Sequence, residues 1–113
     1  MSDQNLAPNS LSAVEAAARI KEGRLSSEDL VKACLQRIAE TDDQLHAWAY
    51  LDAEEALSQA RALDMQRFRG RPLGPLHGVP VGLKDIIDTC DQPTQRGSSV
   101  FDGRRPEQDA VIV

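Results

Sequence analysis

The sequence has 113 residues, of which 41% are hydrophobic and 27% charged, a balance typical of one soluble globular domain. A net charge of −5 and an aromatic content of 4% argue against a nucleic-acid-binding surface, which needs clustered basic residues and stacking aromatic side chains. Residues 1–10 form a polar tail without the apolar core of a secretory signal, and no segment is apolar enough to span a membrane. We therefore expect a cytoplasmic protein.

Three stretches combine apolar residues at helical spacing with residues that favour the start of a helix. The predicted helices cover residues 11–22, 27–41 and 53–68. Their expected N-caps are Ser10 or Ser12, Ser26, and Asp52. Cys34 lies on the apolar face of the second helix and is predicted to be a small core residue. Neither Cys34 nor Cys90 belongs to a metal-binding pattern, so no metal site is expected.

The composition changes at Gly70, where three glycines and three prolines within residues 70–80 predict a connector. Residues 79–84, VPVGLK, predict a short strand that ends at Lys84 and carries apolar side chains on one face. The segment that follows is rich in loop-forming residues. Asp109 is then expected to cap a final helix that begins with AVIV.

Lys84 allows two interpretations from its position alone. At the carboxyl end of a strand in an α/β fold it would lie where such folds place ligand sites. A lysine amine that is held neutral there can act as a general base. The more frequent alternative is an ordinary lysine whose side chain reaches from the end of a strand to water.

Other polar residues near Lys84 offer weaker candidates for chemistry. Asp85 and Asp88 have no third residue spaced to bind a metal with them, so a structural role is favoured for both. Ser98 and Ser99 do not fit the GxSxG pattern of a serine nucleophile, and no histidine and aspartate are placed by motif to activate them.

The segment GPLHGVPVGLKDIIDT, residues 74–89, with the PT and GSS that follow it, resembles the signature block of the amidase signature family. The order of the predicted helices agrees with that family, and the resemblance extends from about Leu11 to Val113. The malonamidase-like bacterial amidases are the most similar branch. The resemblance implies an α/β fold with a mixed sheet between helices. Residues 11–113 would supply N-terminal helices and the first core strand, in a chain truncated before the Gly/Ser-rich catalytic segment.

The resemblance also implies a hydrolase that cleaves carbon–nitrogen amide bonds with a serine nucleophile, a second serine in a cis peptide and a lysine. Lys84 matches this lysine, which accepts the nucleophile's proton through the bridging serine and returns one to the leaving amine. No metal or organic cofactor is implied. Both serines would follow Val113, so the 113-residue chain alone is predicted to be inactive. The resemblance implies a small-molecule amide substrate as the partner, and neither nucleic acid nor a membrane. A homodimer is compatible with the resemblance.

Two alternative functions stay open. The first is the A subunit of a tRNA-dependent amidotransferase, a relative that works in a complex and releases ammonia from glutamine. It ranks second, because in that branch the residues after the lysine commonly differ from DIIDT. The other alternative is a non-catalytic module that folds alone or binds a partner. Gln95 and Arg96 stand where smaller or apolar residues are usual in the family, so the substrate preference is not predicted.

Overall fold

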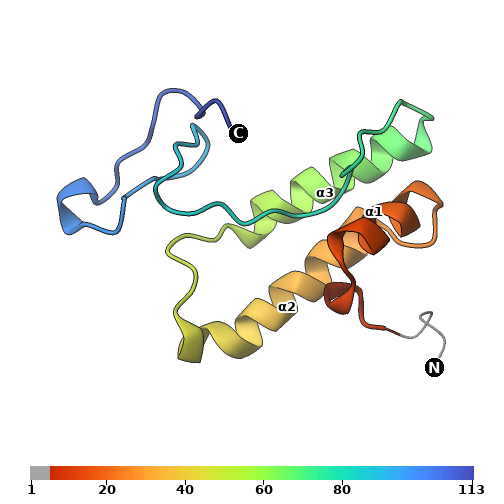
Figure 1. Ribbon diagram of the computed structural model, residues 1–113, viewed down its shortest axis with the longest axis horizontal. Coiled ribbons are helices and arrows are strands. Elements are labelled where there is room, and N and C mark those ends of the chain that lie inside the picture. The colour runs from red at the N-terminus through yellow and green to blue at the C-terminus, as the bar shows by residue number, and fades with distance from the viewer. Residues whose placement is uncertain (1–5) are drawn as a thin grey trace. The chain divides into compact units, whose positions relative to one another are not determined.

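The computed structural model describes residues 6–113, in which the regular elements are helices (Figure 1). In chain order they are η2 (Pro8–Ser10), α1 (Ala13–Lys21), α2 (Ser27–Leu45), α3 (Ala53–Phe68) and η3 (Ser99–Phe101). The described residues divide into two compact units. The first unit contains the described residues up to Ala47 together with Asp52–Pro80, and the second contains Trp48–Leu51 and Val81–Val113. No helix within residues 6–113 is long and apolar enough to cross a membrane.

The three predicted α-helices are confirmed, together with the residues expected to cap them. Each N-cap side chain accepts a hydrogen bond from the backbone N–H three residues on: Ser12 at 3.1 Å, Ser26 at 3.0 Å and Asp52 at 3.0 Å. Such a bond satisfies one of the N–H groups that the first turn of a helix leaves without a partner. Helix α2 runs to Leu45 rather than to residue 41. It ends at His46, whose backbone adopts the left-handed conformation with φ of 51°.

A cluster of buried hydrophobic residues joins α1 and α2 in the first unit, and Ala60 of α3 is buried as well. Ala16, Ile20 and Leu30 form this cluster, and Ile20 is only 1% exposed. Cys34 packs against this cluster as a partly buried residue, which confirms its predicted role. Burial raises the pKa of the Cys34 thiol, because the low-dielectric surroundings disfavour the thiolate. Cys34 is therefore a structural residue and a poor nucleophile.

The start of α2 is joined to α3 and to the connector by hydrogen bonds of buried and partly buried groups. Both carboxylate oxygens of Asp64 accept backbone hydrogens, from Ser27 N–H at 2.7 Å and Glu28 N–H at 3.0 Å. The Ser27 hydroxyl donates to the Gly78 carbonyl at 2.7 Å. The connector therefore meets α2 through its backbone, at a position where Gly78 adopts a φ of +83°.

Two predicted elements are absent from the described residues. Residues 79–84 form no strand, since nothing in residues 6–113 supplies the ladder of hydrogen bonds that a strand needs and Pro80 has no N–H to donate. The α/β character of the fold is therefore not confirmed, because the regular elements of the described chain are all helical. The final helix is also missing. Asp109 accepts the Cys90 N–H instead of capping a helix, and residues 110–113 form a single turn.

The predicted tail, residues 1–10, lies partly outside the described residues. Within the described part, Pro8–Ser10 form the short helix η2, which begins with a proline at its first position. Proline is favoured there because its φ suits a helix and the missing N–H would have had no partner in the first turn.

Candidate functional site

Lys84 lies in the second unit, with an exposed side chain. Its carbonyl oxygen accepts a hydrogen bond from Ile87 N–H at 3.0 Å, so Lys84 opens a turn instead of closing a strand. Among the described residues, the Lys84 amine forms no ion pair with a carboxylate. The exposure of Lys84 within residues 6–113 does not decide between the two interpretations, and its catalytic role stays a prediction.

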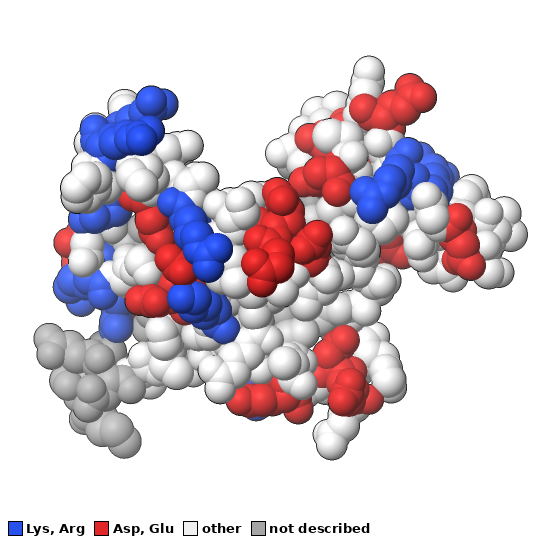
Figure 2. Space-filling model, turned by 180° about the vertical axis from the view of Figure 1, so that it is seen from behind, with Lys and Arg blue, Asp and Glu red and all other residues white. Residues whose placement is uncertain are grey.

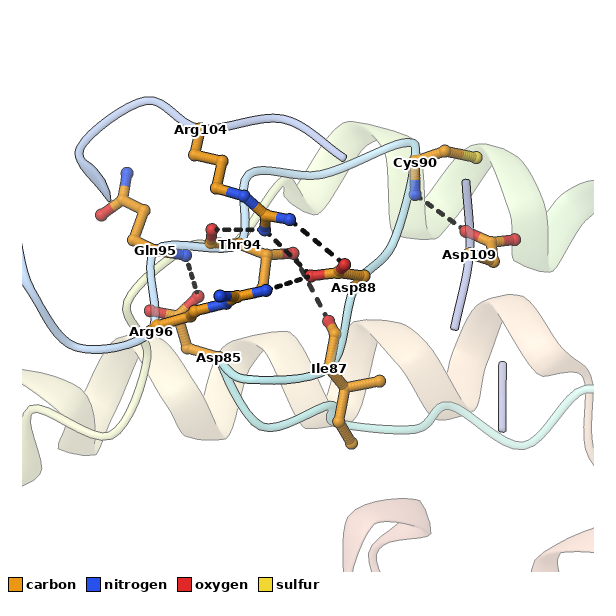
Figure 3. Close-up of polar contacts among 9 residues, drawn as sticks. All are labelled: Asp85, Ile87, Asp88, Cys90, Thr94, Gln95, Arg96, Arg104 and Asp109. Atoms are coloured by element: carbon orange, nitrogen blue, oxygen red, sulfur yellow. Dashed lines mark hydrogen bonds and ion pairs between the residues drawn. The ribbon is translucent and has the colours of Figure 1, made fainter. Parts of the chain in front are cut away.

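The residue after Lys84 is held by two hydrogen bonds to a single turn of the chain (Figure 3). Asp85 Oδ1 accepts the Gln95 N–H at 2.8 Å, and the Asp85 carbonyl accepts the Arg96 N–H at 2.8 Å. Arg96 adopts a left-handed backbone with φ of 56° and is followed by Gly97 with φ of 69°. This turn presents successive N–H groups to Asp85, which therefore has the structural role that its position predicted.

Asp88 and Arg104 form a two-pronged ion pair across the same loop (Figure 3). The guanidinium nitrogens Nη1 and Nη2 lie 2.9 Å and 3.2 Å from the two carboxylate oxygens. Arg96 Nη2 lies farther away, at 4.0 Å from Asp88 Oδ1. The hydrogen bonds from Arg104 hold the pKa of the Asp88 carboxyl below its ordinary value, and the same contact raises the pKa of Arg104.

Thr94 joins the two sides of this loop. It is 1% exposed, its N–H donates to the Arg104 carbonyl at 2.9 Å, and its carbonyl accepts from Arg104 Nη1 at 3.3 Å. Its hydroxyl also donates to the Ile87 carbonyl at 3.4 Å. Thr94 and Arg104 were not predicted from the sequence. Thr94 is a threonine that follows a proline, and Arg104 is an arginine in a loop. Neither feature signals in the sequence that the two residues, ten positions apart, are in contact.

Ser98 and the thiol-bearing Cys90 are both engaged in structural contacts in this unit. Ser98 Oγ accepts the Val100 N–H at 3.3 Å and so caps η3. Cys90 donates its N–H to Asp109 Oδ1 at 2.8 Å. A side-chain hydrogen bond with Asp109, aided by burial, raises the pKa of the Cys90 thiol and keeps it protonated near neutral pH. Neither residue has the activating partner that a nucleophile needs within the described chain.

A hollow of about 590 Å³ lies in the first unit. Leu25, Met65 and Phe68 supply much of its apolar lining. Its charged members are Glu28, Arg61, Asp64 and Arg67, and the first two pair with each other at 3.1 Å. Figure 2 shows acidic and basic side chains interspersed over the face that it displays. Glu28, Arg61 and Asp64 are occupied by protein partners, and among the described residues Arg67 Nε is buried without a hydrogen-bond partner. One such group is not a set of polar groups that converge on a ligand.

Acid is expected to weaken the second unit through Asp88. Because the folded-state pKa of Asp88 lies below its ordinary value, its stabilising contribution is present above that value and is lost as the pH falls through the folded pKa. Asp88→Asn should therefore lose less protection below about pH 4 than the wild type does. Hydrogen exchange of the loop amides across this pH range is the measurement.

Asp102→Asn is the matched control, since Asp102 is an exposed aspartate of the same unit without a described ion pair. Added salt should shrink the difference, because the Asp88 and Arg104 side chains are 31% and 30% exposed. Equal acid sensitivity of wild type and Asp88→Asn would show that the ion pair carries none of the effect.

The chain is similar in sequence to a known protein family and to several named proteins. A sequence model of the family described as Amidase matches residues 29–113. The chain is similar to the A subunit of the glutamyl-tRNA(Gln) amidotransferase of Salinispora arenicola (strain CNS-205), with 46% identity over 92% of this chain and 21% of the relative. Its counterpart of the same name in Streptomyces avermitilis is 44% identical over 99% of this chain and 22% of the relative. The chain thus spans about a fifth of the length of these curated relatives.

Two kinds of solved structure resemble the chain. A fatty acid amide hydrolase aligns with 30% identity and a TM-score of 0.83, over 96% of this chain and 19% of that one. A protein from a vestigial complex related to the origins of an s-triazine catabolic enzyme aligns with 32% identity and a TM-score of 0.84, over 90% and 22%. Lys84 and the loop that follows it lie within the residues that the family model matches.

Proposed function

The chain belongs to the amidase family, and from this premise we propose that the full-length protein cleaves a carbon–nitrogen amide bond with Lys84 as its proton carrier. The observation that carries the proposal is the family match over residues 29–113, which includes the lysine block GVPVGLKD. The ordered loop after Lys84 supports it, because a catalytic group must be held in place by its surroundings.

The proposed chemistry assigns one task to Lys84. Its neutral amine accepts, through a bridging serine, the proton of a serine hydroxyl that attacks the amide carbon. The carbon–nitrogen bond then breaks, and a proton passes back to the leaving ammonia or amine. Water cleaves the resulting ester and regenerates the serine. The two serines are proposed to lie in a Gly/Ser-rich segment of the full-length protein that these 113 residues do not contain.

Within the family, we favour a component of an amidotransferase that releases ammonia from glutamine. The similarity to the A subunits of two glutamyl-tRNA(Gln) amidotransferases, at 44% and 46% identity, supports this choice. It reverses the order expected from the residues DIIDT, which had favoured a free-standing amidase. The free-standing amidase is the second candidate, and the 30% identity to a fatty acid amide hydrolase supports it.

The test measures ammonia release by the full-length protein, alone and with its co-expressed neighbouring gene products, from glutamine and from a simple aliphatic amide. An amidotransferase component should act on glutamine and gain activity from its partners. A free-standing amidase should act alone and prefer another amide. The 113-residue chain is the negative control and should release no ammonia above background, because a lysine without a serine has nothing to activate.

Absence of ammonia release from every amide, with and without partners, would contradict both candidates. It would favour the third interpretation, a non-catalytic module. A Ser98→Ala variant of the 113-residue chain tests the remaining alternative. Turnover by that chain that disappears in the variant would mean that Ser98 acts as a nucleophile and not as the cap of η3.

A further inference from the structure

Asp85 lies directly beside Lys84 and is bound to a separate turn of the chain through both its side chain and its backbone. We infer that Asp85 is a positioning residue, which fixes the backbone at Lys84 by accepting the N–H of Gln95. The inference rests on the proposed function of Lys84. It adds a residue that touches no substrate and acts only through its neighbour.

Three hydrogen bonds surround the Lys84–Asp85 peptide on its C-terminal side. Lys84 O accepts from Ile87 N–H at 3.0 Å and closes a turn. Asp85 Oδ1 and Asp85 O accept from Gln95 and Arg96, each at 2.8 Å. Figure 3 shows the Asp85 carboxylate directed at the Gln95 amide. The backbone of Lys84 and Asp85 is thus held by hydrogen bonds to both of their carbonyl oxygens and to the Asp85 side chain.

The contact uses Asp85 as a hydrogen-bond acceptor and not as a charge. Its partner is a neutral backbone N–H, and among the described residues Asp85 forms no ion pair with Lys84 or with an arginine. Asp88, three residues on, is the carboxylate that pairs with Arg104. An asparagine side chain also carries an acceptor oxygen, so it can replace Asp85 in this contact.

The consequence for Lys84 follows from the length of its side chain. The Lys84 amine lies at the end of a four-carbon stem, so a rotation of the backbone at Lys84 displaces the amine more than it displaces the Cα atom. Misplacement by about 1 Å can cost about 100-fold in rate. The hydrogen bond that Gln95 N–H donates to Asp85 Oδ1 restricts the movement of the backbone at Asp85, the residue next to Lys84.

The test compares three variants of the full-length protein in kcat, KM and pH profile for ammonia release. Asp85→Ala should lower kcat about 100-fold with KM changed less than about twofold, since substrate binding is left intact. Asp85→Asn should keep kcat within about threefold of wild type, because the acceptor is retained. Asp85→Glu keeps the charge but moves the acceptor by one carbon, and should resemble Asp85→Ala.

Two further measurements keep the test decisive. The pH profile of Asp85→Asn should coincide with that of wild type, whereas a charge that tunes Lys84 would shift it. Hydrogen exchange of the backbone amides of residues 94–97 should rise in Asp85→Ala and stay low in Asp85→Asn. Asp102→Asn is the matched control, because Asp102 is an exposed aspartate of the same unit without a described ion pair, and its kcat should stay within about threefold.

The outcomes separate the inference from the proposed function. If wild type is inactive, or if Lys84→Ala keeps full activity, the proposed function fails and the inference falls with it. If Lys84→Ala is inactive while Asp85→Ala keeps wild-type kcat, the inference alone fails. It also fails if Asp85→Glu outperforms Asp85→Asn, or if Asp102→Asn loses as much kcat as Asp85→Ala. Should Asp85→Ala not fold, the comparison of the Asn and Glu variants still decides.

Discussion

Replacing Lys84 by alanine in the full-length protein is expected to lower kcat/KM for amide cleavage by about 100- to 10,000-fold, the usual range for a placed acid or base. The fold should be little affected. Lys84 is exposed in the described chain, so its truncation there leaves no buried cavity and no unpaired partner.

Lys84→Arg separates a base from a positive charge. Arginine stays protonated at neutral pH and cannot accept a proton, so this variant should be almost as inactive as Lys84→Ala. Lys32→Ala is a suitable control, since Lys32 is an exposed lysine of α2 whose ion pair with Glu28 lies in the other unit. The measurements are kcat/KM on one amide and a thermal melt. Near wild-type activity of Lys84→Arg would mean that the charge matters and proton transfer does not.

The helices could be predicted from the sequence because their signals are local. Ser12, Ser26 and Asp52 each cap a helix through a contact only three residues away. The apolar spacing of α1 and α2 also agrees with the faces that they bury. The end of α2 was harder to place. Residues 42–44 are polar, and the helix ends where His46 adopts a left-handed backbone for which the sequence gives no local signal.

The strand over residues 79–84 could not be established in this way, because a strand forms only with a neighbour. Alternating apolar residues describe a segment that could pair, and the partner that would complete the ladder is not among residues 6–113. The chain instead continues from Lys84 into a turn, where Ile87 N–H supplies the hydrogen bond to the lysine carbonyl.

The contacts within the candidate site could also not be predicted from local sequence. The lysine block was recognisable because its letters are contiguous, and the family match confirms that recognition. The contacts of Asp85 with Gln95, and of Asp88 with Arg104, link residues ten and sixteen positions apart. Any of several polar residues in this loop could have made them, so only the folded loop shows which acceptor faces which donor.

Gly78→Ala is expected to destabilise the first unit strongly, because two costs add at one position. Gly78 has a φ of +83°, a backbone conformation that costs a residue with a Cβ about 1–2 kcal/mol. The new Cβ would also lie 3.1 Å from Ile20 Cδ1 and 3.1 Å from Ser27 Cβ, both on fully buried side chains. Forcing such neighbours apart typically costs about 1–3 kcal/mol more.

Gly70→Ala isolates the first of these costs. Gly70 has a similar φ of +71° in the same connector, but nothing lies within 4 Å of the position that its Cβ would occupy. It should therefore lose only the backbone term of about 1–2 kcal/mol. Urea unfolding of the full-length protein, with hydrogen exchange of α1 and α2, measures both variants. Equal losses would mean that Ile20 and Ser27 move aside freely, and that the buried bond from Ser27 Oγ to the Gly78 carbonyl does not require their close approach.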